Sequence, residues 1–403
     1  MRITKLTLAV LVATGTLFTS CSSDDNNKIE DVLKFTKTLD DIDTSGLTIP
    51  TNYEFTRNQE TTVNFSGQTT RLNQVVEIGA LMTTVDPIPT QTDFTNRFNQ
   101  ATEFTDTSLN GSKNVRSKVA ASVGLFSDNT SASDAIKADF DGYLTNQLTV
   151  LASKEEAAQG VAGIYDGKRF LNEKGLEYNQ AFYKGLIGAL AMDQTLNHYF
   201  NRLDDNFDGT NAYKTANDAG TLVSEANYTT MEHHFDEAYG YVYGAGDADK
   251  LLGHYLEEIT GQSYFANIPE IVKNAFIIGR AAVVAKQYEA RDAAIEVLRY
   301  QLSKIPAARG VYYLQKAKGS IDGEDSRAAF HALSEAYGFI YSLQFTYNPL
   351  TNEPYFTKAE SEALVNKLYG STNGFYDLTA EKLEELSEEI VAKYDFTIEQ
   401  VNQ

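Results

Sequence analysis

The sequence has only one cysteine, no tryptophan and seven prolines among its 403 residues. The cysteine, Cys21, lies close to the N-terminus, so the rest of the chain has no disulfide and no cysteine nucleophile. No GxSxG motif for a nucleophilic serine is present, and no GxGxxG or GKS/T motif for binding phosphate. These absences exclude several common classes of enzyme, and stability must come from packing alone.

Basic residues are also fewer than acidic ones, 34 against 55, so the formal net charge is −21. Affinity for nucleic acid rests on cationic contacts to phosphate, so we expect no nucleic-acid partner. After the N-terminal region, no apolar run approaches the ~20 residues that a membrane-spanning helix needs. The missing tryptophan weighs against a glycan-binding platform but does not remove it, since tyrosine also stacks on sugars.

The first residues have the pattern of an export signal. Arg2 and Lys5 precede a short apolar run, and the ending Leu-Phe-Thr-Ser-Cys resembles a bacterial lipobox. We expect residues 1–20 to be a signal peptide, with lipid attached to Cys21 and residues 21–50 as a tether. The alternative is a plain signal peptide with an unmodified cysteine. The Ser-Ser-Asp-Asp-Asn-Asn stretch after Cys21 resembles the signal that sends Bacteroidota lipoproteins to the surface of the outer membrane.

Helical spacing of apolar residues dominates the rest of the chain. Residues 53–55 and 62–65 alternate as short strands would, and strand patterns are scarce beyond residue 70. The clearest helix covers residues 175–203, where Gly185 and Gly188 indicate close approach of another backbone. Thr379 is placed to cap a late helix. The predicted class is all-α, with two related helical bundles over residues 51–220 and 221–403 and a short extended segment near the N-terminus.

One segment occurs twice in the sequence as an internal repeat. Residues 233–244 read HHFDEAYGYVYG and residues 331–342 read HALSEAYGFIYS, with six of twelve positions identical. In a helix, each copy places a His and a Glu one turn apart. If the copies face each other, their side chains form a shared centre suited to Zn²⁺ or iron; the candidate ligands are His233, His234, Glu237, His331 and Glu335. The alternative is that the repeat preserves packing, with each His–Glu pair closed within its own bundle.

A shorter motif resembles the opening of a calcium loop. Asp204, Asn206 and Asp208 fall at the spacing of the first three oxygen ligands of an EF-hand, followed by a glycine. The twelfth position holds Thr215 in place of the bidentate glutamate. An Asx-rich turn that ends the preceding helix is therefore the favoured interpretation.

The tetrad His234-Phe235-Asp236-Glu237 resembles the HxxE motif of the imelysin-like proteins, a family of two four-helix bundles. Residues 65–71, 175–186, 233–241 and 374–379 resemble a related family of Bacteroidota lipoproteins of unknown function. The resemblance implies that His234 and Glu237 line a cleft between bundles. It also implies links to iron or haem acquisition, to polysaccharide binding in one branch, and to peptidase activity in others. Glu232 stands where the family motif has glycine.

Three functions follow from these features. The favoured one is a surface lipoprotein that binds iron, haem or a metal in a polar cleft, with the outer membrane and a receptor in it as partners. The second is a glycan-binding lipoprotein. The third is a peptidase, which is disfavoured because the sequence lacks the second histidine of an HExxH motif.

Overall fold

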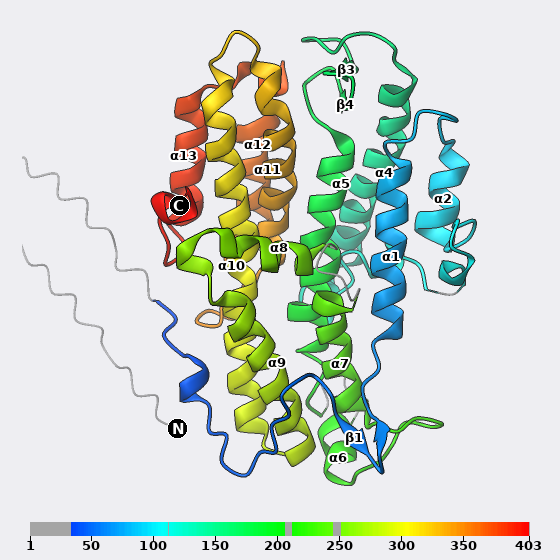
Figure 1. The fold of residues 1–403 in the computed structure, drawn as a ribbon, viewed down its shortest axis with the longest axis vertical. Helices are drawn as coiled ribbons and strands as arrows, with labels where there is room; N and C mark the ends of the chain where they lie inside the picture. The colour runs from blue at the N-terminus through cyan, green and yellow to red at the C-terminus, as the bar shows by residue number, and fades with distance from the viewer. Residues whose placement is uncertain (1–33, 112, 206–211, 245–250, 403) are drawn as a thin grey trace, which may run out of the picture. The chain divides into compact units, whose positions relative to one another are not determined.

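Helices make up most of the computed structural model, which describes residues 34–111, 113–205, 212–244 and 251–402 (Figure 1). The predicted all-α class is confirmed. The helices are α1 (Ser66–Leu81), α2 (Gln91–Gln100), α3 (Val123–Phe126), α4 (Thr130–Ala152), α5 (Tyr178–Leu186), α6 (Tyr213–Asp218), α7 (Thr230–Tyr243), α8 (Leu252–Glu258), α9 (Ile268–Ala285), α10 (Tyr288–Ile321), α11 (Phe330–Ser342), α12 (Lys358–Tyr369), α13 (Ala380–Val391) and α14 (Ile398–Asn402).

Two small antiparallel hairpins accompany the helices. β1 (Thr56–Arg57) pairs with β2 (Glu60–Thr61), so the strands lie between residues 53–55 and 62–65, the two stretches in which the alternation predicts strands. β3 (Gly163–Tyr165) pairs with β4 (Arg169–Leu171), a hairpin that the sequence pattern did not reveal. The Asp166 and Gly167 backbones between β3 and β4 have positive φ angles, the twist that a tight hairpin turn needs.

The predicted helix over residues 175–203 is observed as α5 followed directly by a π-helix, η4 (Ile187–Tyr199), in which every residue is buried. A Cβ atom added at Gly188 would lie 2.5 Å from the Ser342 Cβ atom. The close backbone approach predicted from the two glycines is therefore confirmed at Gly188, and the neighbour is α11. Thr379 caps α13 as predicted, since its Oγ1 atom accepts the Lys382 N–H.

The long helix formed by α5 and η4 organises the packing. α11 packs on α5, and α7 packs on η4, while α10 packs on α9, α11 and α13 (Figure 1). Residues from Lys34 onward form one compact unit, so the predicted boundary at 220/221 falls within a continuous core. The reason is that α11 packs on α5 and α7 packs on η4, so two extensive helix contacts cross that boundary.

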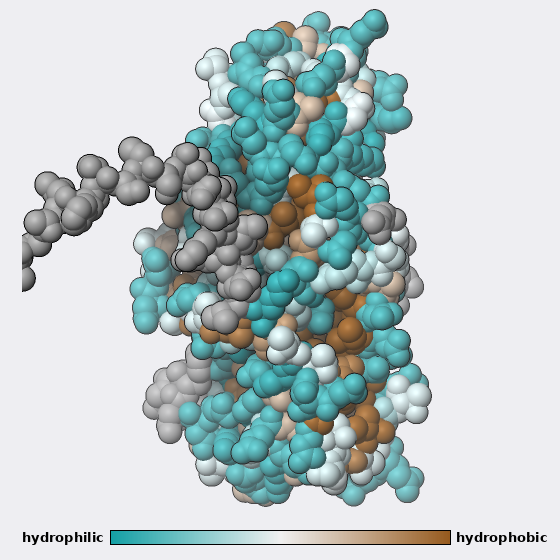
Figure 2. Space-filling view, turned by 90° about the vertical axis from the view of Figure 1, so that its left-hand side faces the viewer, coloured by the Kyte–Doolittle hydropathy of each residue, from teal (hydrophilic) through white to brown (hydrophobic). Residues whose placement is uncertain are grey.

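Part of the expected tether is packed against the helices. Ile42 is buried, and the Gln287 side chain donates a hydrogen bond to the Ser45 carbonyl oxygen. This part of residues 34–50 therefore contacts α9 and α10, with Ser45 at the connection between the two helices. Cys21 and the signal sequence lie outside the described residues. Hydrophilic residues cover much of the face drawn in Figure 2, with smaller apolar areas between them. Within the described parts of the chain, no helix is both long and apolar enough to span a bilayer.

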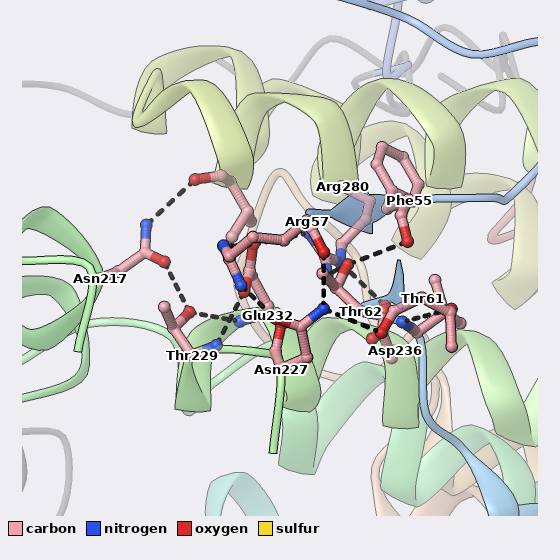
Figure 3. Close-up of polar contacts among 12 residues, drawn as sticks. Phe55, Arg57, Thr61, Thr62, Asn217, Asn227, Thr229, Glu232, Asp236 and Arg280 are labelled. Atoms are coloured by element: carbon pink, nitrogen blue, oxygen red, sulfur yellow. Dashed lines mark hydrogen bonds and ion pairs between the residues drawn. The ribbon is translucent and has the colours of Figure 1, made fainter. Parts of the chain in front are cut away.

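A buried cluster of charges fixes the β1–β2 segment to α7 and α9. This Arg280 cluster consists of Arg57, Glu232, Asp236 and Arg280 (Figure 3). The Arg280 Nε atom donates to Asp236 Oδ1 at 2.8 Å, and its Nη1 atom donates to Glu232 Oε1 at 3.3 Å. Arg57 Nη2 donates to the same Glu232 oxygen at 2.9 Å. Three segments far apart in the sequence are thus joined through two buried carboxylates.

Candidate functional site

The first copy of the repeated segment lies on α7, where Glu237 is held by two neighbouring helices. Its Oε1 atom accepts hydrogen bonds from Tyr199 Oη and from Gln68 Nε2, both at 3.1 Å. His233 lies 3.9 Å from the same oxygen through its Nε2 atom, and its ring stacks on Tyr228 with ring centres 4.5 Å apart. The carboxylate of Glu237 is therefore occupied by contacts within the protein.

His234 points to a different set of neighbours. Its Nδ1 atom donates a hydrogen bond of 2.8 Å to the Arg202 carbonyl oxygen, and its ring meets the Tyr213 ring edge-on. Burial lowers the pKa of His234, so the neutral ring is favoured. The histidine of the HxxE tetrad thus fixes the chain after η4.

The second copy lies on α11 and forms a similar set of polar contacts. His331 Nδ1 donates to Glu177 Oε1 at 2.9 Å, and its Nε2 atom lies 3.6 Å from Glu335 Oε2. Lys184 of α5 pairs with Glu335 at 3.2 Å. This copy links one histidine, two glutamates and a lysine in a chain of contacts that runs along α5 and α11.

The two copies are equivalent in how they cross a neighbouring helix. A Cβ atom at Gly240 would lie 3.0 Å from the Cβ atom of Gln68, and one at Gly338 would lie 2.4 Å from the Cβ atom of Lys184. Gln68 and Lys184 are also the residues that contact the repeated glutamates, Glu237 and Glu335. The repeat therefore preserves a close helix crossing together with one polar contact across it.

The five candidate ligands form two separate clusters. Among the described residues, no group of three or more His, Cys, Asp or Glu side chains could hold a metal ion. The shared Zn²⁺ or iron centre predicted from the repeat is therefore not formed, because α7 packs on η4 while α11 packs on α5. In the motif that resembles a calcium loop, Asp204 Oδ1 accepts a hydrogen bond from Arg291, and Asn206 and Asp208 lie outside the described residues.

His331 is the candidate that lines an open pocket. This basic pocket has a volume of about 370 Å³ and lies between the β3–β4 hairpin, the C-terminal part of α10 and the start of α11. Its wall carries four cationic side chains, which are Lys168, Arg169, Lys316 and Arg327. They come from three distant segments, so no local motif in the sequence could have indicated them.

The cations of the basic pocket differ in how firmly they are held. Arg327 donates two hydrogen bonds to Asp325 and one to Glu156, which fixes its guanidinium group. Arg169 lies 3.9 Å from Glu177 Oε2, and Lys316 lies over the Tyr313 ring at 5.8 Å. Lys168 pairs with Asp166 at 2.9 Å, so carboxylates lie beside three of the four cations. The pocket thus gathers four cations whose number is matched by neighbouring carboxylates, on a chain of net charge −21.

Comparison with protein families places these features in one domain. A family model described as "Domain of unknown function (DUF4856)" matches residues 50–397. The chain belongs to the DUF4856 family. The matched region contains both copies of the repeat and every residue of the basic pocket. The comparisons with curated proteins and with solved structures each gave no match.

The π-helix of this DUF4856 domain carries two buried ionisable groups with opposite pKa shifts. Asp193 Oδ2 accepts the Ala121 and Ser122 backbone N–H groups, both at 2.9 Å, while Oδ1 has no hydrogen-bond partner among the described residues. Burial raises the pKa of Asp193 to about 7. Burial, helped by Lys118 nearby, lowers the pKa of His198 to about 3. Both groups are therefore neutral in the folded protein in mildly acidic solution.

The DUF4856 variant Asp193→Asn is expected to change how stability depends on pH. Between about pH 4 and pH 7, folded Asp193 keeps a proton that the unfolded chain releases, so this group lowers stability as pH rises. His198 acts in the opposite direction over much of this window, because the unfolded chain binds its proton. In Asp193→Asn the contribution of this group is absent. The free energy of unfolding should therefore rise more steeply with pH than in wild type, by up to about 1.4 kcal/mol per pH unit.

Urea denaturation at several pH values measures this difference. The variant His198→Gln is the matched control, since it should shift the slope in the opposite direction. Parallel stability profiles for wild type and Asp193→Asn would show that Asp193 titrates alike in the folded and unfolded chains.

Proposed function

We propose that this protein is a surface-anchored binding component that takes a small organic anion into the basic pocket. The single observation that carries this proposal is the convergence of Lys168, Arg169, Lys316 and Arg327 around one cavity. Carboxylates hold three of these cations in place, whereas Lys316 lies over the Tyr313 ring, so an anion that enters the cavity meets preorganised cationic groups. Guanidinium and ammonium groups form their strongest hydrogen bonds with carboxylates and phosphates.

Lipid attachment at Cys21 and the outer-membrane location belong to the same proposal and rest on the lipobox-like sequence. The relationship to imelysin-like proteins rests on the His234–Glu237 tetrad. Within this proposal, the iron role takes the form of binding a carboxylate-bearing ferric chelate. A direct iron site built from the repeated histidines is not part of it, because those side chains lie in two clusters.

An acidic glycan is the second candidate for the anion. Its support is Tyr165, which lines the same pocket with its ring stacked on the Arg327 guanidinium group at 4.7 Å. A uronic acid offers a carboxylate to the cations and an apolar sugar face to the aromatic ring. The ferric chelate and the acidic glycan both present a carboxylate to the pocket. They differ in the molecule to which that carboxylate belongs.

Isothermal titration calorimetry of the full mature chain with citrate, ferric citrate and galacturonate tests the proposal. We expect Lys316→Gln and Arg169→Gln each to weaken the affinity for the bound anion about tenfold, since each removes a charge-assisted contact. The matched control is Lys382→Gln, because Lys382 is exposed on α13 and does not line the pocket.

The three probes separate the candidate roles. Tighter binding of ferric citrate than of citrate supports the iron role, and binding of galacturonate alone supports the glycan role. If none of the three binds, or if both pocket variants bind as tightly as the control, the basic pocket is not an anion site.

A further inference from the structure

A second pocket on the other side of α11 is lined mainly by tyrosine. It has a volume of about 330 Å³ and lies between α4, α11 and α12. Four of its lining side chains are tyrosines, Tyr143, Tyr337, Tyr341 and Tyr369, and the charged ones are Asp139 and Glu362. We call this site the tyrosine pocket, and it is independent of the basic pocket.

The tyrosine rings stand nearly at right angles to one another. The Tyr143 and Tyr337 rings have an interplanar angle of 80° with centres 6.4 Å apart, and the Tyr337 and Tyr369 rings have an angle of 85° at 5.6 Å. Rings in this arrangement form adjacent walls of a box. The hydroxyl groups of Tyr143 and Tyr337 meet at 3.2 Å, which fixes the two walls relative to each other.

Negative charge lies at the same pocket. Asp139 and Glu362 are both exposed, and Asp139 Oδ2 accepts a hydrogen bond of 2.8 Å from Tyr341 Oη. One ring of the box already binds a cation within the protein, because Lys174 Nζ lies over the Tyr369 ring at 4.9 Å. Aromatic walls combined with nearby carboxylates are the surroundings that a large, weakly hydrated cation prefers.

We propose that the tyrosine pocket binds an organic ammonium ion. The ring faces supply cation–π attraction, and the two carboxylates supply charge that a neutral ligand would not need. Tyr143 and Tyr341 are only 8% and 7% exposed, so the partly exposed rings of Tyr337 and Tyr369 provide the faces that a bound cation would meet.

Choline and its neutral isostere 3,3-dimethylbutan-1-ol provide a direct test by isothermal titration calorimetry on the full mature chain. The two ligands have the same shape and differ in charge. We expect choline to bind at least about tenfold more tightly than the neutral alcohol, the factor that a desolvated cation–π contact contributes. Equal affinities, or no binding of choline, would overturn the proposal.

Two charge variants beside the tyrosine pocket are expected to change choline affinity in opposite directions. Glu362→Gln is expected to weaken choline binding about threefold, and Lys358→Gln to strengthen it by a similar factor, because Lys358 pairs with Glu362 at 3.2 Å and repels a bound cation. The matched control is Glu385→Gln, which removes an exposed charge on α13 away from the pocket.

A ring variant tests the aromatic walls separately. Tyr369→Leu should weaken choline binding about tenfold without changing the affinity for the neutral isostere. Circular dichroism confirms that each variant is folded, and the exposed charge variants decide the outcome if Tyr369→Leu unfolds. Unchanged choline affinity in both Glu362→Gln and Lys358→Gln would contradict the site.

Discussion

Replacing Arg280 with methionine is expected to lower the free energy of unfolding by about 3–5 kcal/mol, the cost of leaving buried charges without their partner. Arg280 and Asp236 are both fully buried, and Glu232 is almost so. In Arg280→Met, Asp236 keeps its hydrogen bond from Tyr53 but loses its positive partner. Urea denaturation of wild type and variant measures the loss.

A compensated variant separates this cause from lost packing. In the triple variant Arg280→Met, Asp236→Asn, Glu232→Gln, the buried charges are removed together, and much of the stability should return. A loss below roughly 1 kcal/mol in the single variant, as for an exposed ion pair, would show that water reaches the Arg280 cluster.

The variant Gly338→Ala is expected to lower the free energy of unfolding by about 3 kcal/mol, the upper part of the range for overpacking a core. The added methyl group would lie 2.4 Å from the Lys184 Cβ atom and 2.9 Å from the Gly185 backbone nitrogen. Backbone cannot move aside as the end of a flexible side chain can, so α5 and α11 would have to separate. Thermal or urea unfolding measures the effect.

Two further glycine variants make this test specific. Gly240→Ala should destabilise in the same way, because its Cβ atom would meet Phe65 and Gln68. Gly142→Ala is the matched control, since nothing lies within 4 Å of an added Cβ atom in the middle of α4. That change should stabilise the protein by about 0.5–1 kcal/mol, the usual gain in a helix interior. Equal effects of Gly142→Ala and Gly338→Ala would contradict the role of the repeat in helix crossing.

Local patterns in the sequence were sufficient for much of the fold. The helical class, the Thr379 cap and the close approach at Gly188 all depend on residues that are near one another in the chain or on a single helix face. Such features follow from short-range geometry. The π-helical geometry of η4 was not predicted, because apolar and polar residues alike are buried there and give no distinct spacing.

The functional predictions depended on how helices face each other, which periodicity does not determine. The repeat correctly marks two His–Glu pairs on equivalent helices, but it does not specify that α7 and α11 pack on successive parts of the same long helix. The basic pocket shows the same limit, because its cations come from the β3–β4 turn, the end of α10 and the segment before α11. Only the three-dimensional arrangement brings Arg169 beside His331.

The pairing of α5 with α11 also constrains how the chain folds. The Gly188 backbone N–H donates to Ser342 Oγ, a contact between residues separated by 154 positions. Until residues beyond 330 are available, α5 lacks α11, the helix with which it makes its most extensive contact. Contacts of such high sequence separation slow folding, because a long loop must close before they form. The two halves of the chain therefore acquire their native core together and late.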